Sequence, residues 1–272
     1  MKNLFNLKNK TVLVTGAAGL LADQYIDVVL KNEGKLVLID INLAKLKNIK
    51  NKIYKNYSEK IYIFKGDVTK YSQILKISKL LKKQKIKIDV LINNAAINYK
   101  IDNNHKKVSD QIKLEKFSTK IWKKDLDVSL LGSLNCIKIF GTEMVKNKYG
   151  IILNIASDLS IIAPDNRIYN DGKNMKIVKP ISYSVAKHGI VGLTKYVAAY
   201  WGIKNVRCNA IAPGGVYDGQ PKKFLNKISK LIPMGRLAKK NEFKSTILYL
   251  ISDASSYMNG SVLSIDGGRT IL

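Results

Sequence analysis

The sequence predicts an α/β fold in which a doubly wound, seven-stranded parallel sheet of Rossmann type carries helices on both faces. Short apolar runs rich in β-branched residues alternate with helix-length segments, the pattern of repeated β-α units. The first unit, Thr11 to Leu30, passes from an apolar strand through Gly16 and Gly19 into a helix. No Pro/Ser-rich linker divides the 272 residues, so we expect one domain over 1–272.

The elements follow this pattern along the chain. After the first strand at Thr11, strands are predicted at Leu36–Asp40, Ile61–Lys65, Ile88–Ile92, Ile151 to Ser157, Val206 to Ala212 and Ser261–Ile265. Helices are expected from about Asn42, from about Ser72, from Ser118 to about Lys148, from Ser182, near Phe224–Leu231, and from Glu242. The polar segment Ile97 to Lys116 lacks periodicity, so we interpret it as a surface excursion.

The turn after the first strand is a candidate dinucleotide site. Gly16 and Gly19 lead directly into a helix, whose first N–H groups and dipole attract phosphate. The second strand ends in Asp40, where a carboxylate can accept from the adenosine ribose hydroxyls and disfavours a 2′-phosphate. Neither Ala18 nor Ile41 supplies a cation for that phosphate. We therefore expect NAD, with NADP disfavoured.

Two further turns fall at the carboxyl ends of strands, the edge where open α/β sheets bind ligands. Asp67-Val68 follows the third strand and Asn94-Ala95-Ala96 follows the fourth. The acid can accept from the adenine amino group, and the small residues let a cofactor approach the backbone. Taken singly, either segment is equally compatible with an ordinary turn.

Composition excludes several classes. The net charge of +27 is almost all Lys, scattered as pairs without a long basic run, so we expect a solvated surface and no nucleic-acid binding. No apolar run approaches the roughly 18 residues of a membrane span, and the first residues lack the apolar core of a signal peptide, which favours a cytoplasmic protein without membrane contact. Cys136 and Cys208 are too few for a disulfide framework or metal site, and we expect reduced core residues.

Acid–base chemistry is predicted at Tyr183 and Lys187, which lie four apart and share one helix face. A neighbouring ammonium should lower the pKa of the phenol from its usual value near 10. Ser157, from the neighbouring strand end, could hold a substrate oxygen. The Tyr-x-x-x-Lys pattern occurs three times, also at Tyr169 and Tyr200, so its spacing alone decides nothing. Only Tyr183 starts a strong helix that follows a strand ending in Ser.

A loop of about 158–180 leaves the same sheet edge and carries many charges. Asp158 and Arg167 are its candidate substrate contacts, because Arg and Lys over a site suit an anionic sugar. The alternative, that these are solvated charges of a lysine-rich protein, is equally compatible with the sequence.

Together these segments resemble the short-chain dehydrogenase/reductase family over nearly the full length. The matching residues, in the family's order, are Thr15-Gly16-Ala17-Ala18-Gly19, Asp40, Asp67-Val68, Asn93-Asn94-Ala95-Ala96, Ser157, Tyr183-x-x-x-Lys187, Pro213-Gly214 and Asp266-Gly267-Gly268. The loop segment Ala163-PDNRIY is more weakly similar to bacterial members from surface-polysaccharide and nonulosonic-acid pathways.

The resemblance implies strand order 3-2-1-4-5-6-7, a nicotinamide cofactor, Tyr183 as acid/base, Lys187 as its partner, Ser157 as substrate orienter, and a homotetramer or homodimer through the two long helices. It also implies cofactor contacts at Gly16, Gly19, Leu20, Leu21, Asp40, Ile41, Asp67, Val68, Asn94, Ala95, Ala96, Tyr183, Lys187, Pro213, Gly214 and Val216.

Three departures from the family pattern bear on activity. Leu20 and Ala22 stand where the glycine turn usually has its last two glycines, which should weaken cofactor binding. Ser129 stands at the position of a catalytic Asn in the long helix; a hydroxyl can hold water but makes fewer contacts. Asp218 lies nearest the position of a Thr that hydrogen-bonds the nicotinamide amide.

The leading interpretation is an NAD(P)-dependent oxidoreductase that interconverts a secondary alcohol and a ketone on a polar, sugar-like or anionic small molecule. Two alternatives stay open. One is reduction of a 3-oxoacyl carrier-protein thioester, for which a cationic surface would suit the acidic carrier. The other is a non-catalytic dinucleotide-binding or regulatory protein, motivated by Ser129, Leu20 and Ala22.

Overall fold

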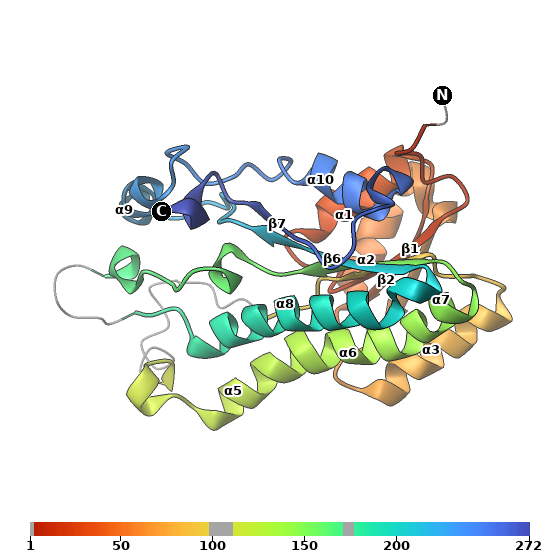
Figure 1. The fold of residues 1–272 in the computed structure, drawn as a ribbon, viewed down its shortest axis with the longest axis horizontal. Helices are drawn as coiled ribbons and strands as arrows, with labels where there is room; N and C mark the ends of the chain where they lie inside the picture. The colour runs from red at the N-terminus through yellow and green to blue at the C-terminus, as the bar shows by residue number, and fades with distance from the viewer. Residues whose placement is uncertain (1–2, 98–110, 171–176) are drawn as a thin grey trace.

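The computed structural model describes residues 3–97, 111–170 and 177–272. Seven parallel strands form one sheet in the order β3-β2-β1-β4-β5-β6-β7 (Figure 1), which confirms the predicted doubly wound topology. The strands are β1 (Thr11–Thr15), β2 (Lys35–Asp40), β3 (Ile61–Lys65), β4 (Val90–Asn93), β5 (Gly150–Ile155), β6 (Val206–Pro213) and β7 (Val262–Ile265). The strand order reverses between β1 and β4, and such switch points are where open α/β sheets bind ligands.

The helices lie where the sequence periodicity predicts them. They are α1 (Ala22–Lys31), α2 (Leu43–Asn48), α3 (Tyr71–Lys83), α5 (Thr119–Leu126), α6 (Gly132–Cys136), α7 (Thr142–Lys146), α8 (Ile181–Trp201), α9 (Lys222–Ile228) and α10 (Lys244–Ile251). Helices α5, α6 and α7 are one continuous helix, because wider π turns at Asp127–Leu131 and Ile137–Gly141 join them. As predicted, Ser118 caps its start, with Oγ accepting from the Ile121 N–H at 3.5 Å.

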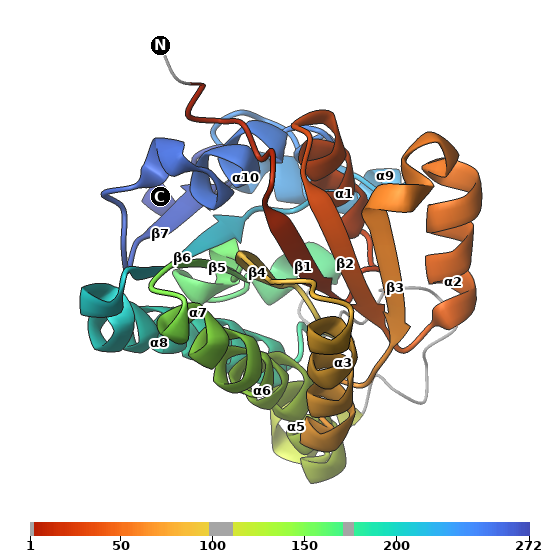
Figure 2. The same ribbon diagram turned by 90° about the vertical axis from the view of Figure 1, so that its right-hand side faces the viewer.

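Two helical layers cover the sheet. Helices α1 and α10 pack on one face, and α3, the α5 to α7 helix and α8 pack on the other (Figure 2). The alternation along β1 separates the two cores: Val12 and Val14 belong to the α1 side, and Leu13 belongs to the α8 side. Cys136 and Cys208 are free and buried in the second core, as predicted.

The helix Thr119–Lys146 is long and apolar enough, by length and composition, to cross a membrane, which the sequence analysis did not anticipate. More than half of its apolar window is buried against the sheet and α8, so a position in the core accounts for its composition. The sequence predicts an apolar stripe on this helix at Leu126, Leu130, Leu134, Ile137, Gly141 and Met144. Ile137 and Met144 are buried, as this stripe predicts, but Leu134 is 40% exposed.

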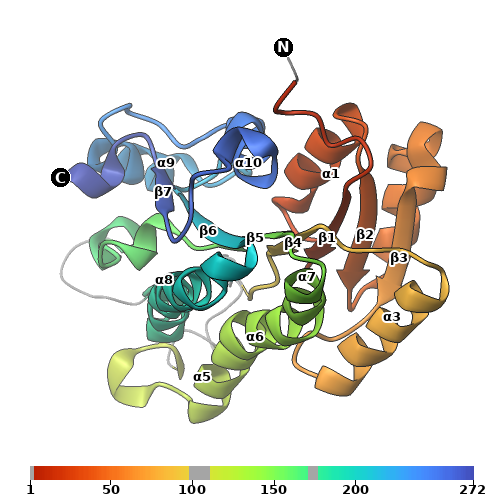
Figure 3. The same ribbon diagram turned by 45° about the vertical axis from the view of Figure 1, so that its right-hand side comes forward.

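Most of the predicted surface excursion at Ile97 to Lys116 lies outside the described residues, apart from a short 3-10 turn at Leu114–Lys116. The predicted loop after β5 contains two such turns, Asp158–Ser160 and Asn166–Tyr169. The C-terminal residues after β7 lie beside this loop (Figure 3), which brings the end of the chain to the carboxyl edge of the sheet.

Candidate active site

The turn between β1 and α1 forms a close-fitting cradle. Gly16 has φ +61°, and a Cβ placed there would lie 2.7 Å from Ala95 Cα, so only glycine fits. Leu21, the N-cap residue of α1, provides no side-chain capping bond, and Leu20 is exposed. In the protein alone, the Ala22 and Gln24 N–H groups donate to the Gly19 and Leu21 carbonyls, so the turn itself occupies part of the start of α1.

Asn94 ties the end of β4 to this turn. Its Nδ2 donates to the Gly16 carbonyl at 2.9 Å, and its Oδ1 accepts from the Tyr25 hydroxyl at 3.1 Å. The Thr15 hydroxyl accepts from the backbone N–H groups of Asn94 and Ala95. These hydrogen bonds hold the Ala95-Ala96 backbone next to the glycine turn. The predicted cofactor contacts at Ala95 and Ala96 depend on this position.

Asp40 lies at the end of β2 with both oxygens oriented by backbone N–H groups. Oδ2 accepts from Ala18 at 3.0 Å and Oδ1 accepts from Asn42 at 2.8 Å. The neighbouring Ile41 side chain is 67% exposed. The structure thus places a carboxylate beside the cradle, where a ribose diol could reach it.

The Asp67-Val68 turn reaches the same edge from β3. Asp67 Oδ1 accepts from the Thr69 hydroxyl at 2.8 Å, and the Val68 carbonyl accepts from Asn135 Nδ2 of α6 at 2.9 Å. A Cβ on Gly132 of α6 would lie 2.5 Å from Val68 Cγ2, so the helix passes close behind the turn. This contact and the Asn135 hydrogen bond hold the Val68 backbone against α6.

Tyr183 and Lys187 lie on the first turns of α8, facing the end of β5. Lys187 is buried and its Nζ donates to the Ile155 carbonyl at 2.6 Å. Its ammonium lies 5.8 Å from the centre of the Tyr183 ring. The Ser157 hydroxyl interacts with Tyr183 and lowers the pKa of the phenol. The three predicted catalytic residues therefore gather at one point of the carboxyl edge.

The electrostatics of Tyr183 differ from the prediction. Burial raises the pKa of its phenol above the usual value near 10, and the nearby Asp158 carboxylate raises it further. Burial also lowers the pKa of Lys187 to about 8, with a further contribution from the Lys179 ammonium. The expected lowering of the Tyr183 pKa is wrong for the protein alone, because burial and the Asp158 carboxylate both raise it and the Ser157 hydroxyl lowers it by less.

The other two Tyr-x-x-x-Lys pairs do not share this geometry. Tyr200 lies at the far end of α8, is 66% exposed, and stacks on Tyr196. The Tyr169 ring stacks on the Phe224 ring, with 5.6 Å between the ring centres. Lys173, the lysine of this Tyr-x-x-x-Lys pair, lies outside the described residues. Strand β5 ends at Ile155, two residues before the predicted end at Ser157. Tyr183 is the tyrosine of the three that interacts with the Ser157 hydroxyl, and its catalytic role stays a prediction.

Comparison with known proteins places this arrangement in a family. Residues 16–270 match the family model described as enoyl-(acyl carrier protein) reductase. An NAD-dependent glycerol dehydrogenase from Listeria innocua is 30% identical over 272 residues, which cover 98% of this chain and 96% of the relative. The chain belongs to the short-chain dehydrogenase/reductase family. It is thus an oxidoreductase of the class that acts on CH–OH and C=O groups.

Two further similarities describe the range of this dehydrogenase/reductase family. A 3-oxoacyl-[acyl-carrier-protein] reductase from Thermotoga maritima is 29% identical and covers 97% of this chain and 99% of its own length. A short-chain dehydrogenase from Leptospira borgpetersenii, solved with bound NAD+, superposes with a TM-score of 0.85 at 26% identity. That superposition covers 99% of this chain and 96% of the solved one. Binding of a nicotinamide dinucleotide is therefore a property of the fold that this dehydrogenase/reductase shares.

The segment after β6 closes the edge of the site. Gly214 N–H donates to the Ile265 carbonyl at 2.9 Å, and a Cβ on Gly214 would lie 2.8 Å from Asp266 Cα. Val216 forms a parallel bridge with Ala238. The carboxylate of Asp218, at the departure from the family's Thr, pairs with Lys240 at 2.7 Å. This ion pair holds Asp218 toward the 239–240 turn.

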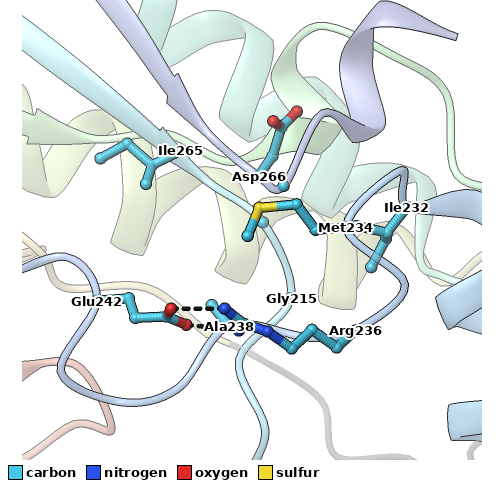
Figure 4. A pocket seen from close by; sticks show the side chains of 10 residues that line it. Gly215, Ile232, Met234, Arg236, Ala238, Glu242, Ile265 and Asp266 are labelled. Atoms are coloured by element: carbon cyan, nitrogen blue, oxygen red, sulfur yellow. Dashed lines mark hydrogen bonds and ion pairs between the residues drawn. The ribbon is translucent and has the colours of Figure 1, made fainter.

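A cleft of about 190 Å³ lies beside this segment, between the carboxyl ends of β6 and β7 and the chain leading to α10 (Figure 4). Gly215, Ile265 and Met234 line it, and Arg236 closes it with a bidentate ion pair to Glu242. Neither Tyr183 nor Ser157 lines this cleft. Gly214, one of the predicted cofactor contacts, does line it.

Ser129 is buried within the first π turn, Asp127–Leu131. Its backbone carbonyl accepts from the Ser133 hydroxyl at 2.6 Å. π turns inside α-helices often occur at functional sites because they re-aim backbone groups. The structure supports a special backbone geometry at this position, while the water-holding role of the Ser129 hydroxyl stays a prediction.

The two predicted substrate contacts are placed differently. Arg167 makes a two-point ion pair with Asp165 of its own turn, and its side chain is 87% exposed. Asp158 is 3% exposed, and its carboxylate is paired with Arg269 at 2.7 Å. The structure thus brings Asp158, but not Arg167, to Ser157 and Tyr183.

Sequence reasoning missed Lys179 and Arg269. The Lys179 ammonium lies 3.9 Å from the centre of the Tyr183 ring, and burial lowers its pKa to about 8. Arg269 is 7% exposed and enters from the C-terminal end of the chain. A signal existed for Arg269, since it is one of only four arginines and directly follows Asp266-Gly267-Gly268. No sequence pattern relates it to Asp158.

Proposed function

We propose that the protein is an NAD-dependent dehydrogenase that interconverts a secondary alcohol and a ketone on a polar, sugar-like substrate. The observation that carries this proposal is the meeting of Ser157, Tyr183 and Lys187 at the carboxyl edge, beside a turn shaped for a dinucleotide. The nicotinamide, when bound, supplies or accepts the hydride. The protein's own residues position the substrate oxygen and move its proton.

The residues around the cradle fit such a cofactor. Gly16 leaves space that any Cβ would fill, and no side chain caps the start of α1, where only the turn carbonyls of Gly19 and Leu21 accept from Ala22 and Gln24. Asp40 would hold the hydroxyls of the adenosine ribose, and Lys187 would hold those of the nicotinamide ribose.

The proton passes through Tyr183. In ketone reduction the phenol donates its proton to the carbonyl oxygen; in alcohol oxidation the phenolate accepts it. Since burial raises the pKa of Tyr183, the phenol is the resting form, which suits a proton donor. Lys187 and a bound positively charged nicotinamide would favour the phenolate when the enzyme runs toward oxidation.

NAD is favoured over NADP by the side chains near Asp40. A 2′-phosphate would meet the Asp40 carboxylate, and Ala18 and the exposed Ile41 offer no compensating cation. The glycerol dehydrogenase relative is described as NAD-dependent, which agrees with this proposal.

A polar substrate is favoured by the groups around Tyr183. Lys179, Asp158, Arg269 and Asp125 influence the charge there, so an apolar chain would bury against ionised groups at a cost. The glycerol dehydrogenase relative acts on a polyol by its name. Reduction of a 3-oxoacyl carrier-protein thioester is the second candidate, because the Thermotoga maritima relative carries that name.

A homo-oligomer is proposed on the outer surface of the two long helices. Leu131, Leu134 and Val185 are each about 40% exposed there, and a Cβ on Gly192 of α8 would meet only open space. A second copy could cover this surface, as a dimer or a tetramer. Light scattering on purified protein, with Leu134→Lys as the disrupting variant, measures the state.

The test measures NADH consumption with polyols, keto-sugars and an acetoacetyl thioester. We expect turnover with a keto-sugar, and a loss of about 10²-fold or more in Tyr183→Phe with unchanged NADH binding. Tyr200→Phe, on the same helix with the same i to i+4 lysine, is the matched control and should keep full activity. Faster turnover of the thioester with NADPH would favour the second candidate. Binding of NADH without turnover of any substrate would favour a regulatory protein.

A further inference from the structure

A chain of three buried side chains connects the catalytic serine to the C-terminus. The Ser157 hydroxyl donates to Asp158 Oδ1 at 2.7 Å, and Arg269 Nη1 donates to Asp158 Oδ2 at 2.7 Å. The three residues are 5%, 3% and 7% exposed, respectively. Arg269 lies 111 positions along the chain from Asp158, and Figure 3 shows the C-terminal residues beside the segment after β5.

This chain determines how the Ser157 oxygen is presented. Its proton is directed to Asp158, and its oxygen also accepts from the Leu159 N–H at 3.2 Å. A hydroxyl has one donor and two acceptor sites, so one acceptor site is left for a donor such as the Tyr183 phenol or a substrate alcohol. To donate to a phenolate or to a substrate oxygen, Ser157 must turn its proton away from Asp158.

The ease of that turn depends on Arg269. The Asp158 carboxylate also accepts from the Leu159 N–H at 2.8 Å, so with Arg269 present its oxygens keep partners when Ser157 turns away. Without the guanidinium, the buried carboxylate would lose its direct ion-pair partner next to Ser157 and keep only the charge of Lys179, which is unfavourable. It would hold the Ser157 proton more tightly.

Other charged groups approach Tyr183 from each neighbouring element, and the charge of one of them, Lys179, also interacts with Asp158. Lys179 lies over the ring from the segment before α8, and Lys187 lies 5.8 Å from the ring centre on α8 itself. Asp125 of α5 accepts from the Ser182 hydroxyl. Tyr169 lies in the turn at Asn166–Tyr169, where the charges of Arg269 and Asp158 both act on its phenol. Among these groups, the described contacts pair Asp158 with Arg269.

We propose that Arg269 is a positioning residue that acts through Asp158. Its guanidinium balances the negative charge of the Asp158 carboxylate, so the Ser157 hydroxyl can alternate between Asp158 and the reacting oxygen. This inference rests on the proposed oxidoreductase function and adds a residue outside the Ser, Tyr and Lys set. Asp158 raises the pKa of Tyr183, so Arg269 also limits that effect. It therefore links the C-terminus to the protonation of the catalytic phenol.

The two partners should have opposite effects when changed singly. Arg269→Gln leaves the carboxylate and removes its compensation, so the pH at which Tyr183 ionises should rise by about one pH unit. Asp158→Asn leaves the guanidinium, so that pH should fall by a similar amount. The double variant Asp158→Asn/Arg269→Gln should return close to the parent. A purely structural role would lower stability in all three without opposite shifts.

The experiment reads the ionisation of residue 183 directly. 3-Fluorotyrosine is placed at position 183 of the full chain, and its fluorine resonance is followed against pH, with the pH profile of turnover measured in parallel. Arg207→Gln is the matched control, because Arg207 is a partly buried arginine that bonds the Met258 and Ser252 carbonyls instead. Circular dichroism restricts the comparison to the pH range where each variant is folded.

Opposite shifts in the two single variants support the proposal, and shifts of one sign, or shifts no larger than in Arg207→Gln, overturn it. Arg269→Lys should restore part of the parent value, because it keeps the charge but loses the planar guanidinium. The fluorine titration needs no substrate. If the wild-type protein turns over no substrate yet the opposite shifts appear, the proposed function fails while this inference stands.

Discussion

The cofactor half and the catalytic half of the carboxyl edge are held together by different forces. Around Gly16, neutral hydrogen bonds from Asn94 and Thr15 and close backbone contacts define the cradle. Around Tyr183, buried charges dominate: Lys187, Lys179, Asp158 and Arg269. The cofactor half depends on shape, so substitutions there should act mainly by steric clash. The catalytic half depends on the balance of charges, so the effects of substitutions there should depend on pH.

The largest expected effect is steric and lies in the cofactor half. Gly16→Val forces a β-branched residue into φ +61° and brings its Cβ to 2.7 Å from Ala95 Cα. We expect a loss of more than about 3 kcal/mol in the free energy of unfolding, together with loss of NADH binding. Thermal unfolding and a fluorescence titration with NADH measure the two effects.

Gly219→Val separates the two causes of this loss. Gly219 has φ +77° but a Cβ there meets nothing within 4 Å. It should therefore show the conformational cost alone, about 1 to 2 kcal/mol, and keep NADH binding. Equal losses in both variants would mean that backbone conformation, and not the contact with Ala95, makes Gly16 necessary.

The difference between the halves also explains what could be read from the sequence. The glycine turn, Asp40 and the alternation of strands and helices are local patterns, because each involves residues close together in the chain or repeated at a fixed period. They predicted the sheet and the cradle. Ser157, Tyr183 and Lys187 were found for the same reason, since each follows directly from a strand end or a helix start.

The charges of the catalytic half could not be read in this way. Asp158 and Arg269 meet across 111 positions, and no spacing rule connects them. Arg167 looked equally suitable in the sequence, but a nearby carboxylate at Asp165 holds it at the surface. The direction of the Tyr183 pKa was wrong because a sequence shows the neighbouring ammonium but not the depth of burial.

The second prediction concerns charge in the catalytic half. Burial lowers the pKa of Lys187 in the folded protein to about 8 from an unfolded value of 10.5. Between these values the unfolded state binds more protons, so stability should rise with pH from about 8 to 10.5. Below about pH 8 both states are charged and the cost of burying the ammonium is complete.

Lys187→Met should remove part of this rise and make the protein more stable at neutral pH, by roughly 2 to 3 kcal/mol, while abolishing activity. Lys195→Met changes an exposed lysine on the same helix and should leave the pH dependence unaltered. Chemical denaturation at several pH values measures the slope. A stability that falls between pH 8 and 10 in the wild-type protein would contradict the assignment.

In the cofactor half, the proposed selectivity for NAD over NADP depends on the charge of Asp40. Asp40→Asn removes the negative charge and keeps one oxygen acceptor, so one of the two N–H groups of Ala18 and Asn42 loses its side-chain partner. We expect the preference for NADH over NADPH to fall about tenfold, equivalent to about 1.4 kcal/mol. Steady-state kcat/KM with both cofactors measures it, and Asp23→Asn, in the exposed first turn of α1, is the control.

The smallest effect is expected where a charge lies outside both halves. Arg167 and Asp165 form an ion pair on the same loop as Asp158, but the Arg167 side chain is 87% exposed, and exposed pairs contribute little to stability because solvent screens them. Arg167→Ala should therefore change neither the melting temperature nor KM measurably, and it should leave the pH at which Tyr183 ionises unchanged, in contrast to Arg269→Gln. A clear rise in KM for an anionic substrate would instead mean that the loop brings Arg167 over the bound molecule. Arg167 would then belong to the charged groups of the catalytic half, as the sequence predicts, although in the structure of the protein alone it pairs with Asp165.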